Sequence, residues 1–352
     1  MLKNRNNIID ILKGIAIVLI VLGHSAFPFT RFVYLFHVAL FILVSGYFFS
    51  CDRVDSKEKL KEYLVSRIKK LYVPYLVFNL VAVALNNFLL NIHVYNVNNI
   101  HHYFGTIDYI IAFLKVFLFK GHAEILGGTW FLELLFFISI IYAIVCYYLN
   151  IKHWKHSKYV HTIFAVIMLV VGYLLAKFEI EIFIRKQILT CYILFDIGTY
   201  LKKIERISLK KICIIGLISS AFLLSFNAYG QIEISKNIYT DPLFFILCSM
   251  CGFFATYFIS SLINKINILK RIFGFIGSHT MSILILHFIA FKFISFLIIL
   301  FKGDSINMLG MFPVTYKGGY VFILYTIFGI IISLLLDWFY KYIKKKVGFW
   351  DE

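Results

Sequence analysis

Charged side chains are scarce in this chain, because Asp, Glu, Lys and Arg together make up only 15% of its 352 residues. A soluble domain typically carries about a quarter. Hydrophobic residues account for 61% of the chain and aromatic residues for 19%, and the mean hydropathy is +0.86. With so few charges to meet water, much of the surface must face lipid. This composition excludes a soluble protein, a disordered chain and a secreted disulfide scaffold.

Acidic residues are the rarer of the charged types, with 18 Asp and Glu against 35 Lys and Arg, and the net charge is +17. In a soluble protein this excess would suggest nucleic-acid binding. In a lipid-facing chain the positive charges instead report membrane orientation. We therefore expect membrane lipids as partners and no nucleic acid.

Several motifs are also missing. The sequence contains no P-loop, Rossmann fingerprint, nucleophile elbow or zinc motif, so neither ATP use nor a bound metal is predicted. The first apolar stretch lacks a small-residue cleavage site and carries ionisable residues, which favours a retained span over a signal peptide. No linker or clear internal repeat divides the chain. We expect one membrane-embedded domain over residues 1–352.

Long apolar runs dominate what is present, and a helix needs about 20 such residues to cross a membrane. The sequence predicts an all-α polytopic membrane protein with about ten spans. Their approximate ranges are 9–27, 31–50, 71–91, 127–149, 159–176, 183–201, 211–229, 242–263, 280–300 and 320–340. The stretch 107–119 is amphipathic and is predicted to lie at the interface.

The distribution of Lys and Arg supports this topology. With the N-terminus inside, 24 of the 35 fall in inside segments and 9 in outside segments, while Lys13 and Lys292 fall within spans. Such a bias is typical of cytoplasmic loops. The sequence therefore predicts that both termini are cytoplasmic.

The first span carries Asp10, Lys13 and His24, and ionisable groups inside a membrane are functional candidates. Lys13 and His24 are eleven residues apart, about three helical turns, so both project from one face. The simpler interpretation is that Asp10 pairs with Lys13 while His24 bonds to another helix. In the second span His37 is expected at a depth similar to His24, where the two could handle protons as a pair.

From these residues on, the chain resembles the acyltransferase 3 superfamily of integral-membrane acyltransferases, and in particular its single-domain, fucose 4-O-acetylase-like members. The matching elements extend over the whole chain. They are Asp10-(x)2-Lys13-Gly14, Gly23-His24-Ser25, Phe36-His37, Ser45-Gly46-Tyr47, Arg67-Ile68-Lys69-Lys70, Gly128-Thr129-Trp130-Phe131-Leu132, Phe195-(x)2-Gly198 and, after Gly277, Ser282-(x)4-His287. The chain departs from the family pattern at Lys13 and Lys70, where Arg is more common, and at Thr129, which replaces a frequent His.

The resemblance implies that His24 is catalytic, as a general base on an acceptor hydroxyl or as a transient acyl carrier, with His37 and Asp10 assisting. It also implies an acyl-CoA donor, most simply acetyl-CoA. Lys13, Arg67 and Lys70 would hold its phosphates, although an ordinary positive-inside flank is the simpler explanation for the last two. Ser282 and His287 are also expected on the donor side. Because His287 follows the start of its span by only one or two turns, it is predicted nearer the cytoplasm than His24, where it suits a structural hydrogen bond or a donor contact.

Trp130 and Glu133 lie near the outer end of the fourth span and are candidates for acceptor binding. Trp130 suits either a sugar-stacking platform or an aromatic-belt anchor, and Glu133 is unusual in lipid. The predicted function is O-acylation of a cell-surface polysaccharide or lipid-linked sugar, in the cytoplasmic membrane of a bacterium. The alternative is a transporter or exporter of a glycan or small metabolite, with His24, His37 and Glu133 as a relay.

Overall fold

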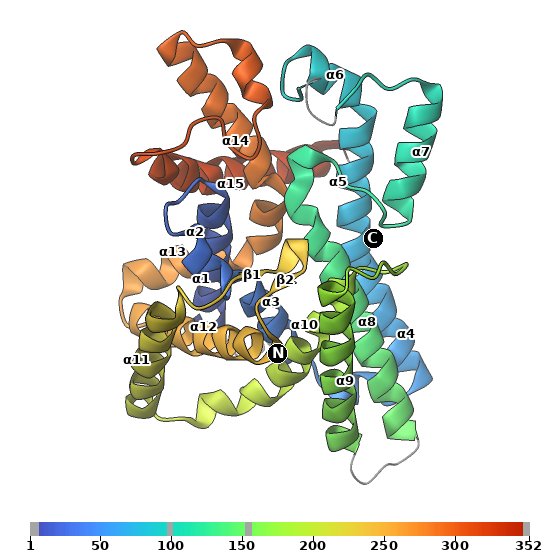
Figure 1. Ribbon diagram of the computed structural model, residues 1–352, viewed down its shortest axis with the longest axis vertical. Coiled ribbons are helices and arrows are strands. Elements are labelled where there is room, and N and C mark those ends of the chain that lie inside the picture. The colour runs from blue at the N-terminus through green and yellow to red at the C-terminus, as the bar shows by residue number, and fades with distance from the viewer. Residues whose placement is uncertain (1–6, 97–100, 152–156, 348–352) are drawn as a thin grey trace. The chain divides into compact units, whose positions relative to one another are not determined.

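The computed structural model describes residues 7–96, 101–151 and 157–347, which are almost entirely helical (Figure 1). The longest helices coincide with the apolar runs. They are α1 (Asn7–His24), α8 (Trp130–Ile151), α9 (Ser157–Lys177), α11 (Leu209–Phe226), α12 (Pro242–Ile263), α14 (Thr280–Lys302) and α15 (Val321–Val347). The shorter α-helices are α2 (Thr30–Tyr34), α3 (His37–Tyr47), α4 (Lys57–Arg67), α5 (Val73–Ala84), α6 (Asn86–Asn91), α7 (Thr106–Phe117), α10 (Lys186–Tyr200) and α13 (Asn267–Ser278).

Short elements connect these helices. Five are 3₁₀ helices and η2 is a turn of π-helix: η1 (Cys51–Val54), η2 (Ile68–Tyr72), η3 (Glu124–Thr129), η4 (Leu201–Arg206), η5 (Ile234–Lys236) and η6 (Ile306–Gly310). Two short strands, β1 (Ile232–Glu233) and β2 (Ile238–Tyr239), pair antiparallel. Asp241 then caps α12, accepting a 2.8 Å hydrogen bond from the Phe244 amide, with Pro242 in the first turn, where a missing N–H costs least.

In the described part of the chain, eight helical stretches are long and apolar enough to cross a membrane: the seven long helices above, and α2 together with α3. The all-α polytopic class is therefore confirmed. Two of the ten predicted spans fall outside this set. The stretch 71–91 divides into the end of η2, α5 and α6, and the stretch 183–201 contains α10 with only 15 residues. A helix of that length rises about 22 Å, and most of α10 is buried, so its apolar residues meet other helices rather than lipid. The amphipathic stretch 107–119 forms α7, and its position at the membrane interface stays a prediction.

The described residues form two compact units, each assembled from three separate stretches. Unit 1 consists of residues 7–16, 31–74 and 130–278, and unit 2 of residues 17–30, 75–129 and 279–347. Each is described by itself below, and one domain over residues 1–352 stays a prediction.

In unit 1, α10 lies at the centre, packed against α3, α8 and α9. Its contact with α3 depends on two facing glycines. A Cβ atom on Gly46 would lie 2.0 Å from the Phe195 carbonyl oxygen, and one on Gly198 would lie 2.2 Å from the Leu43 carbonyl oxygen. Such backbone contact is typical of helix crossings in membranes. Both glycines belong to elements that carry the family resemblance, which explains those positions by packing.

A second glycine crossing joins the first turns of α1 to α13. A Cβ on Gly14 would lie 2.2 Å from the Phe273 carbonyl oxygen, and one on Gly277 would lie 1.8 Å from the Asp10 carbonyl oxygen. Unit 1 also contains a disulfide between Cys51 in η1 and Cys146 in α8. The sequence does not predict this bond, because the two cysteines are 95 residues apart and each lies at the edge of an apolar run.

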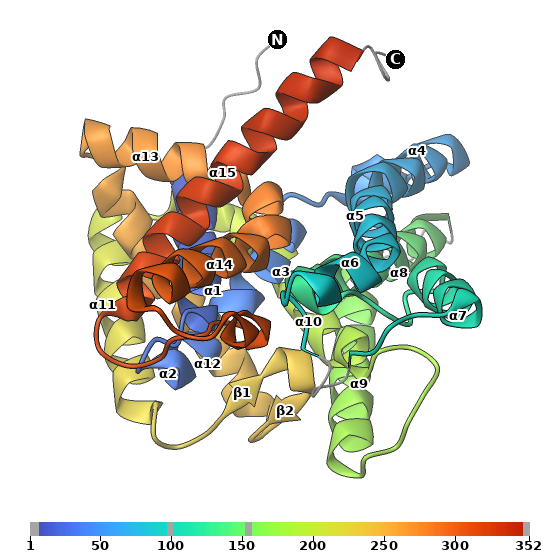
Figure 2. The same ribbon diagram turned by 90° about the horizontal axis from the view of Figure 1, so that it is seen from above.

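In unit 2, α14 packs along α15 and against η3, and Figures 1 and 2 show α14 and α15 as neighbours from both directions. Gly329 of α15 permits the close approach, since a Cβ there would lie 2.7 Å from the Phe291 ring. Helix α14 ends at Gly303, whose φ of +72° is the left-handed conformation that glycine adopts without strain. This packing fixes the face of α14 that carries His287.

We expect Gly46→Ala to lower the unfolding temperature of the purified protein, because the added methyl would force α3 and α10 apart. Overpacking of this kind costs about 1–3 kcal/mol. Gly274→Ala in α13 is the matched control, since nothing lies within 4 Å of its Cβ position. Thermal unfolding of both variants in one detergent measures the effect, and equal melting temperatures would show that the crossing is not tight.

Candidate active site

Two histidines lie together in unit 2. His24 is the last residue of α1 and His287 lies in α14, and their ring centroids are 5.5 Å apart with the planes 26° from parallel. Phe288 packs on both, at 5.0 Å from the His24 ring and 4.0 Å from the His287 ring. His24 is half-buried, whereas His287 is 0% exposed. The stacked rings put the two side chains next to each other, and the prediction that His287 lies nearer the cytoplasm than His24 stays a prediction.

Backbone carbonyls fix the tautomer of His287. Its Nδ1 lies 3.0 Å from the Ile283 oxygen and 2.9 Å from the Leu284 oxygen. Carbonyl oxygens only accept, so Nδ1 carries the hydrogen and donates it, and the neutral ring keeps a lone pair on Nε2. Among the described residues Nε2 has no hydrogen-bond partner, although it is buried. The predicted structural hydrogen bond is confirmed, and the same ring presents an unused basic nitrogen.

The η3 turn approaches His287 closely. A Cβ on Gly128 would lie 2.6 Å from the Leu284 oxygen and 3.1 Å from Cε1 of His287, so glycine is needed there. Thr129, where the family frequently has His, donates a 2.8 Å hydrogen bond to the Leu126 oxygen and accepts one of 3.1 Å from Asn79. Thr129 thus holds the turn that faces the histidines.

Asn79 is a site residue that sequence analysis missed. Its side chain is fully buried and bonds at both ends of η3, donating to Thr129 and accepting from the Ala123 amide at 2.9 Å. The signal available in the sequence was a single Asn in an apolar helix, nine residues after Lys70.

Lys292, also missed, lies five residues after His287 in α14 and is only 4% exposed. Its Nζ donates hydrogen bonds of 2.8 Å to the Leu309 and Met311 carbonyl oxygens. The loop held in this way carries Phe312, whose ring packs 4.7 Å from Phe288. Lys292 therefore anchors a loop against the aromatic side of the histidine pair.

The segment between the third and fourth predicted spans contains His101. His101 pairs with Glu124 at 2.7 Å and its ring stacks 4.0 Å from that of Tyr95. Among the residues that the structure describes, no three His, Cys, Asp or Glu side chains are grouped as metal ligands would be. Burial raises the pKa of Tyr95 above its usual range.

Unit 1 contains Asp10 and Lys13, which form the predicted ion pair at 2.8 Å. It also contains His37, which is buried, with Nδ1 2.9 Å from the Val33 oxygen and its ring stacked 4.7 Å from Tyr34. His24 belongs to unit 2, so its pairing with His37 stays a prediction. The histidine that the structure brings to His24 is His287.

The predicted donor residues divide between the units. Arg67, in unit 1, lies 4.7 Å over the Tyr63 ring, and its buried Nε has no hydrogen-bond partner among the described residues. Lys70 is exposed in η2. Ser282, in unit 2, is half-buried in α14, five residues before His287.

Of the predicted acceptor residues, Trp130 is half-buried at the start of α8, and Glu133 is 4% exposed. Arg185, which precedes α10, bonds the Glu133 carboxylate at 2.5 Å. The charge that looked unusual in lipid is therefore neutralised by an ion pair with one of the few outside arginines.

Apolar helices long enough to cross a membrane, together with a stacked pair of histidines, define a membrane protein with a candidate site for proton transfer. Residues 6–340 match the family model of acyltransferase 3, described as an acyltransferase domain, and the chain belongs to this family. The protein is thus a multi-pass membrane acyltransferase. Comparisons with curated proteins and with solved structures find no match.

We expect Arg185→Met to destabilise the protein by about 3–5 kcal/mol, because it removes the cation that neutralises the buried Glu133 carboxylate. Replacing both partners, in Arg185→Met with Glu133→Leu, should recover most of that loss. Lys186→Met is the control, since its partner Glu181 is exposed and such pairs contribute little. Thermal unfolding in detergent tests this, and a double variant no more stable than Arg185→Met would contradict it.

Proposed function

We propose that this acyltransferase is an O-acetyltransferase of the bacterial cytoplasmic membrane. It moves an acetyl group from cytoplasmic acetyl-CoA to a hydroxyl of a cell-surface or lipid-linked glycan. The observation that carries the proposal is the stacked pair of His24 and His287, with a basic Nε2 unused on His287. The family membership supplies the reaction type.

His24 is the group proposed to act on the acceptor. It removes the hydroxyl proton as the acceptor oxygen attacks the thioester carbonyl, so that an O–H bond and a C–S bond break while a C–O bond forms. The proton passes through imidazole to the departing CoA sulfur. In the alternative route His24 itself takes the acetyl group and passes it on. Both routes need a neutral imidazole, which an apolar environment favours.

His287 is proposed to support His24 rather than to touch the donor first. Its Nδ1–H is engaged by two carbonyls, so only Nε2 can accept a proton or a hydrogen bond. Phe288, Gly128 and the loop anchored by Lys292 pack around His287, which is 0% exposed, and exclude water from its ring. Exclusion of water limits hydrolysis of the thioester.

Donor binding is proposed for Arg67, Lys13 and Lys70 of unit 1 and for Ser282 of unit 2. The unsatisfied Nε of Arg67 is a donor that a phosphate oxygen would satisfy, and guanidinium groups bind phosphate well. Trp130 remains the proposed sugar platform. Glu133 is proposed to act on the acceptor only through the position of Arg185, since that pair is already formed.

We expect His24→Ala to lower acetyl transfer by about 100-fold or more, because general-base catalysis contributes on that order. Protein level and membrane insertion should stay normal. His102→Ala is the matched control, since that side chain is 62% exposed. Transfer of labelled acetyl groups from acetyl-CoA to glycan by purified protein provides the measurement, and full activity of His24→Ala would refute the mechanism.

The acceptor class has a separate test. Mass spectrometry of surface glycans from cells with and without this gene should differ by one acetyl group per repeat. If the purified protein instead moves a glycan while leaving labelled acetyl-CoA intact, transport replaces acyl transfer as the function.

A further inference from the structure

Unit 1 contains a cavity of about 340 Å³ among α8, α9, α10 and the chain after α3, to which no role was assigned above. Ligand pockets begin at roughly this size. The residues around it combine rings, small polar groups and cations, and among them are Phe49, Ser50, Tyr142, Asn150, Lys158 and Lys202. None of the described residues that line it is an acid.

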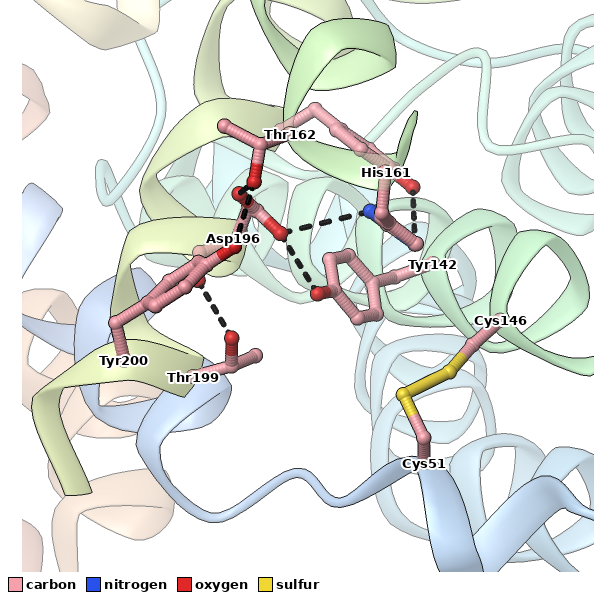
Figure 3. A network of polar contacts seen from close by, with 9 residues as sticks. Cys51, Tyr142, Cys146, His161, Thr162, Asp196, Thr199 and Tyr200 are labelled. Carbon is pink, nitrogen blue, oxygen red and sulfur yellow. Dashed lines mark hydrogen bonds and ion pairs between the residues drawn. A yellow bond between two sulfur atoms is a disulfide. The ribbon is translucent and has the colours of Figure 1, made fainter. Parts of the chain in front are cut away.

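The floor of the cavity rests on a buried polar network around Asp196, which is 2% exposed (Figure 3). Tyr142 donates a 2.8 Å hydrogen bond to Oδ1 of Asp196, and Thr162 donates one of 2.8 Å to Oδ2. His161 lies with Nδ1 3.5 Å from the same Oδ1, beneath the Tyr142 ring at 4.0 Å. Since both carboxylate oxygens are engaged, the floor is fixed and its negative charge is covered by donors.

Two lysines stand at the exposed edge of the cavity. Lys158 holds its Nζ 4.0 Å over the Tyr200 ring, and Lys202 donates a hydrogen bond to the Phe49 carbonyl oxygen. An ammonium group has three donors, so the cation–π contact of Lys158 leaves hydrogen-bonding capacity for a ligand, and Lys202 adds a second positive charge. Two cations beside a cavity without lining acids favour an anion, and phosphate is the anion that lysine commonly binds.

The cavity also has an apolar wall of defined geometry. Phe49 meets the Tyr142 ring edge to face at 5.0 Å. The Cys51–Cys146 disulfide lines the same side and fixes η1 to α8 (Figure 3). The Phe49 ring is only 3% exposed and is enclosed by other aromatic rings, so this wall is apolar and rigid. The polar groups that the edge of a planar base could meet are Ser50 and Asn150. The ligand should therefore join a planar group to phosphates.

An aromatic path connects this cavity to Arg67. The Arg67 guanidinium lies over Tyr63, and Tyr63 meets Phe49 edge to face at 5.5 Å. Tyr63 and Phe49 thus connect the cavity to Arg67, whose Nε is unsatisfied, within the same unit.

The predicted topology fixes the side from which the cavity opens. Its residues come from the ends of the second, fourth and sixth predicted spans and from the start of the fifth. All four positions are cytoplasmic in the orientation that the Lys and Arg distribution favours. A cytoplasmic ligand would enter directly.

We propose that this cavity binds the nucleotide end of the acyl-CoA donor, with its phosphates at Lys158 and Lys202 and its adenine in the cavity at Ser50 and Asn150. This inference rests on the proposed function, because that function supplies a cytoplasmic donor that combines a planar base with phosphates. The pantetheine arm then leaves the cavity on the side of Arg67.

The test measures binding of CoA, adenosine 3′,5′-bisphosphate and inorganic phosphate to the full-length protein in nanodiscs of uncharged lipid. We expect Lys158→Gln and Lys202→Gln to weaken CoA binding about tenfold each, since one charge-assisted contact is of that size. The double variant Lys57→Gln with Lys61→Gln is the control, because both lysines are exposed on α4. These two substitutions remove as much positive charge, from the same predicted side of the membrane, as Lys158→Gln with Lys202→Gln. Adenosine 3′,5′-bisphosphate should compete with CoA, and added salt should weaken both.

Enzyme kinetics separate this site from the chemistry. In Lys158→Gln with Lys202→Gln the KM for acetyl-CoA should rise while kcat stays near wild type, whereas His24→Ala should lose kcat. An unchanged KM in an active enzyme overturns the site and leaves the proposed function intact. Lysine-dependent CoA binding without acetyl transfer refutes the function and leaves the site.

The source of the phosphate is decided by the same variants. If anionic phospholipid or inorganic phosphate binds through Lys158 and Lys202 while adenosine 3′,5′-bisphosphate does not, the cavity holds a lipid headgroup or free phosphate and the proposal is wrong.

Discussion

Inside a membrane, each buried polar group has to find its partner within the chain, because lipid offers none. This constraint organises the molecule. Glu133 pairs with Arg185, Asp10 pairs with Lys13, and Lys292 is held by two carbonyl oxygens. The Glu133–Arg185 pair and the bonds of Lys292 join separate segments of the chain, so there the satisfied polar group also fixes tertiary structure. The few buried groups without such a partner are then informative, since something outside the chain can satisfy them.

His287 illustrates the point. One nitrogen is bound by the backbone of α14 and the other is buried without a partner, next to His24. A purely structural histidine would have both nitrogens engaged, because an unpaired polar atom costs about 1–3 kcal/mol. Gly128 brings η3 so close that no side chain could fit there. The site is thus tightly packed around the one nitrogen that remains available.

The Asp196 network obeys the same rule with the opposite outcome. Tyr142 and Thr162 satisfy its carboxylate completely, which leaves a rigid floor rather than a reactive group (Figure 3). Glycine crossings add the second requirement, close backbone approach, at Gly46 with Gly198 and at Gly14 with Gly277. Several residues that mark the family are therefore packing positions, whereas the histidines are candidates for chemistry.

The sequence alone determined the all-α membrane class, most helix positions, the amphipathic α7 and the family, because apolar runs and short motifs are local properties. It also determined the Asp10–Lys13 pair, whose two residues are one helical turn apart. Only the tertiary structure joined His24 to His287, Glu133 to Arg185, Cys51 to Cys146 and Asp196 to Tyr142. It also showed that α10 is only 15 residues long and mostly buried against other helices. Contacts between distant helices depend on how the helices pack, and neither hydropathy nor residue spacing records that.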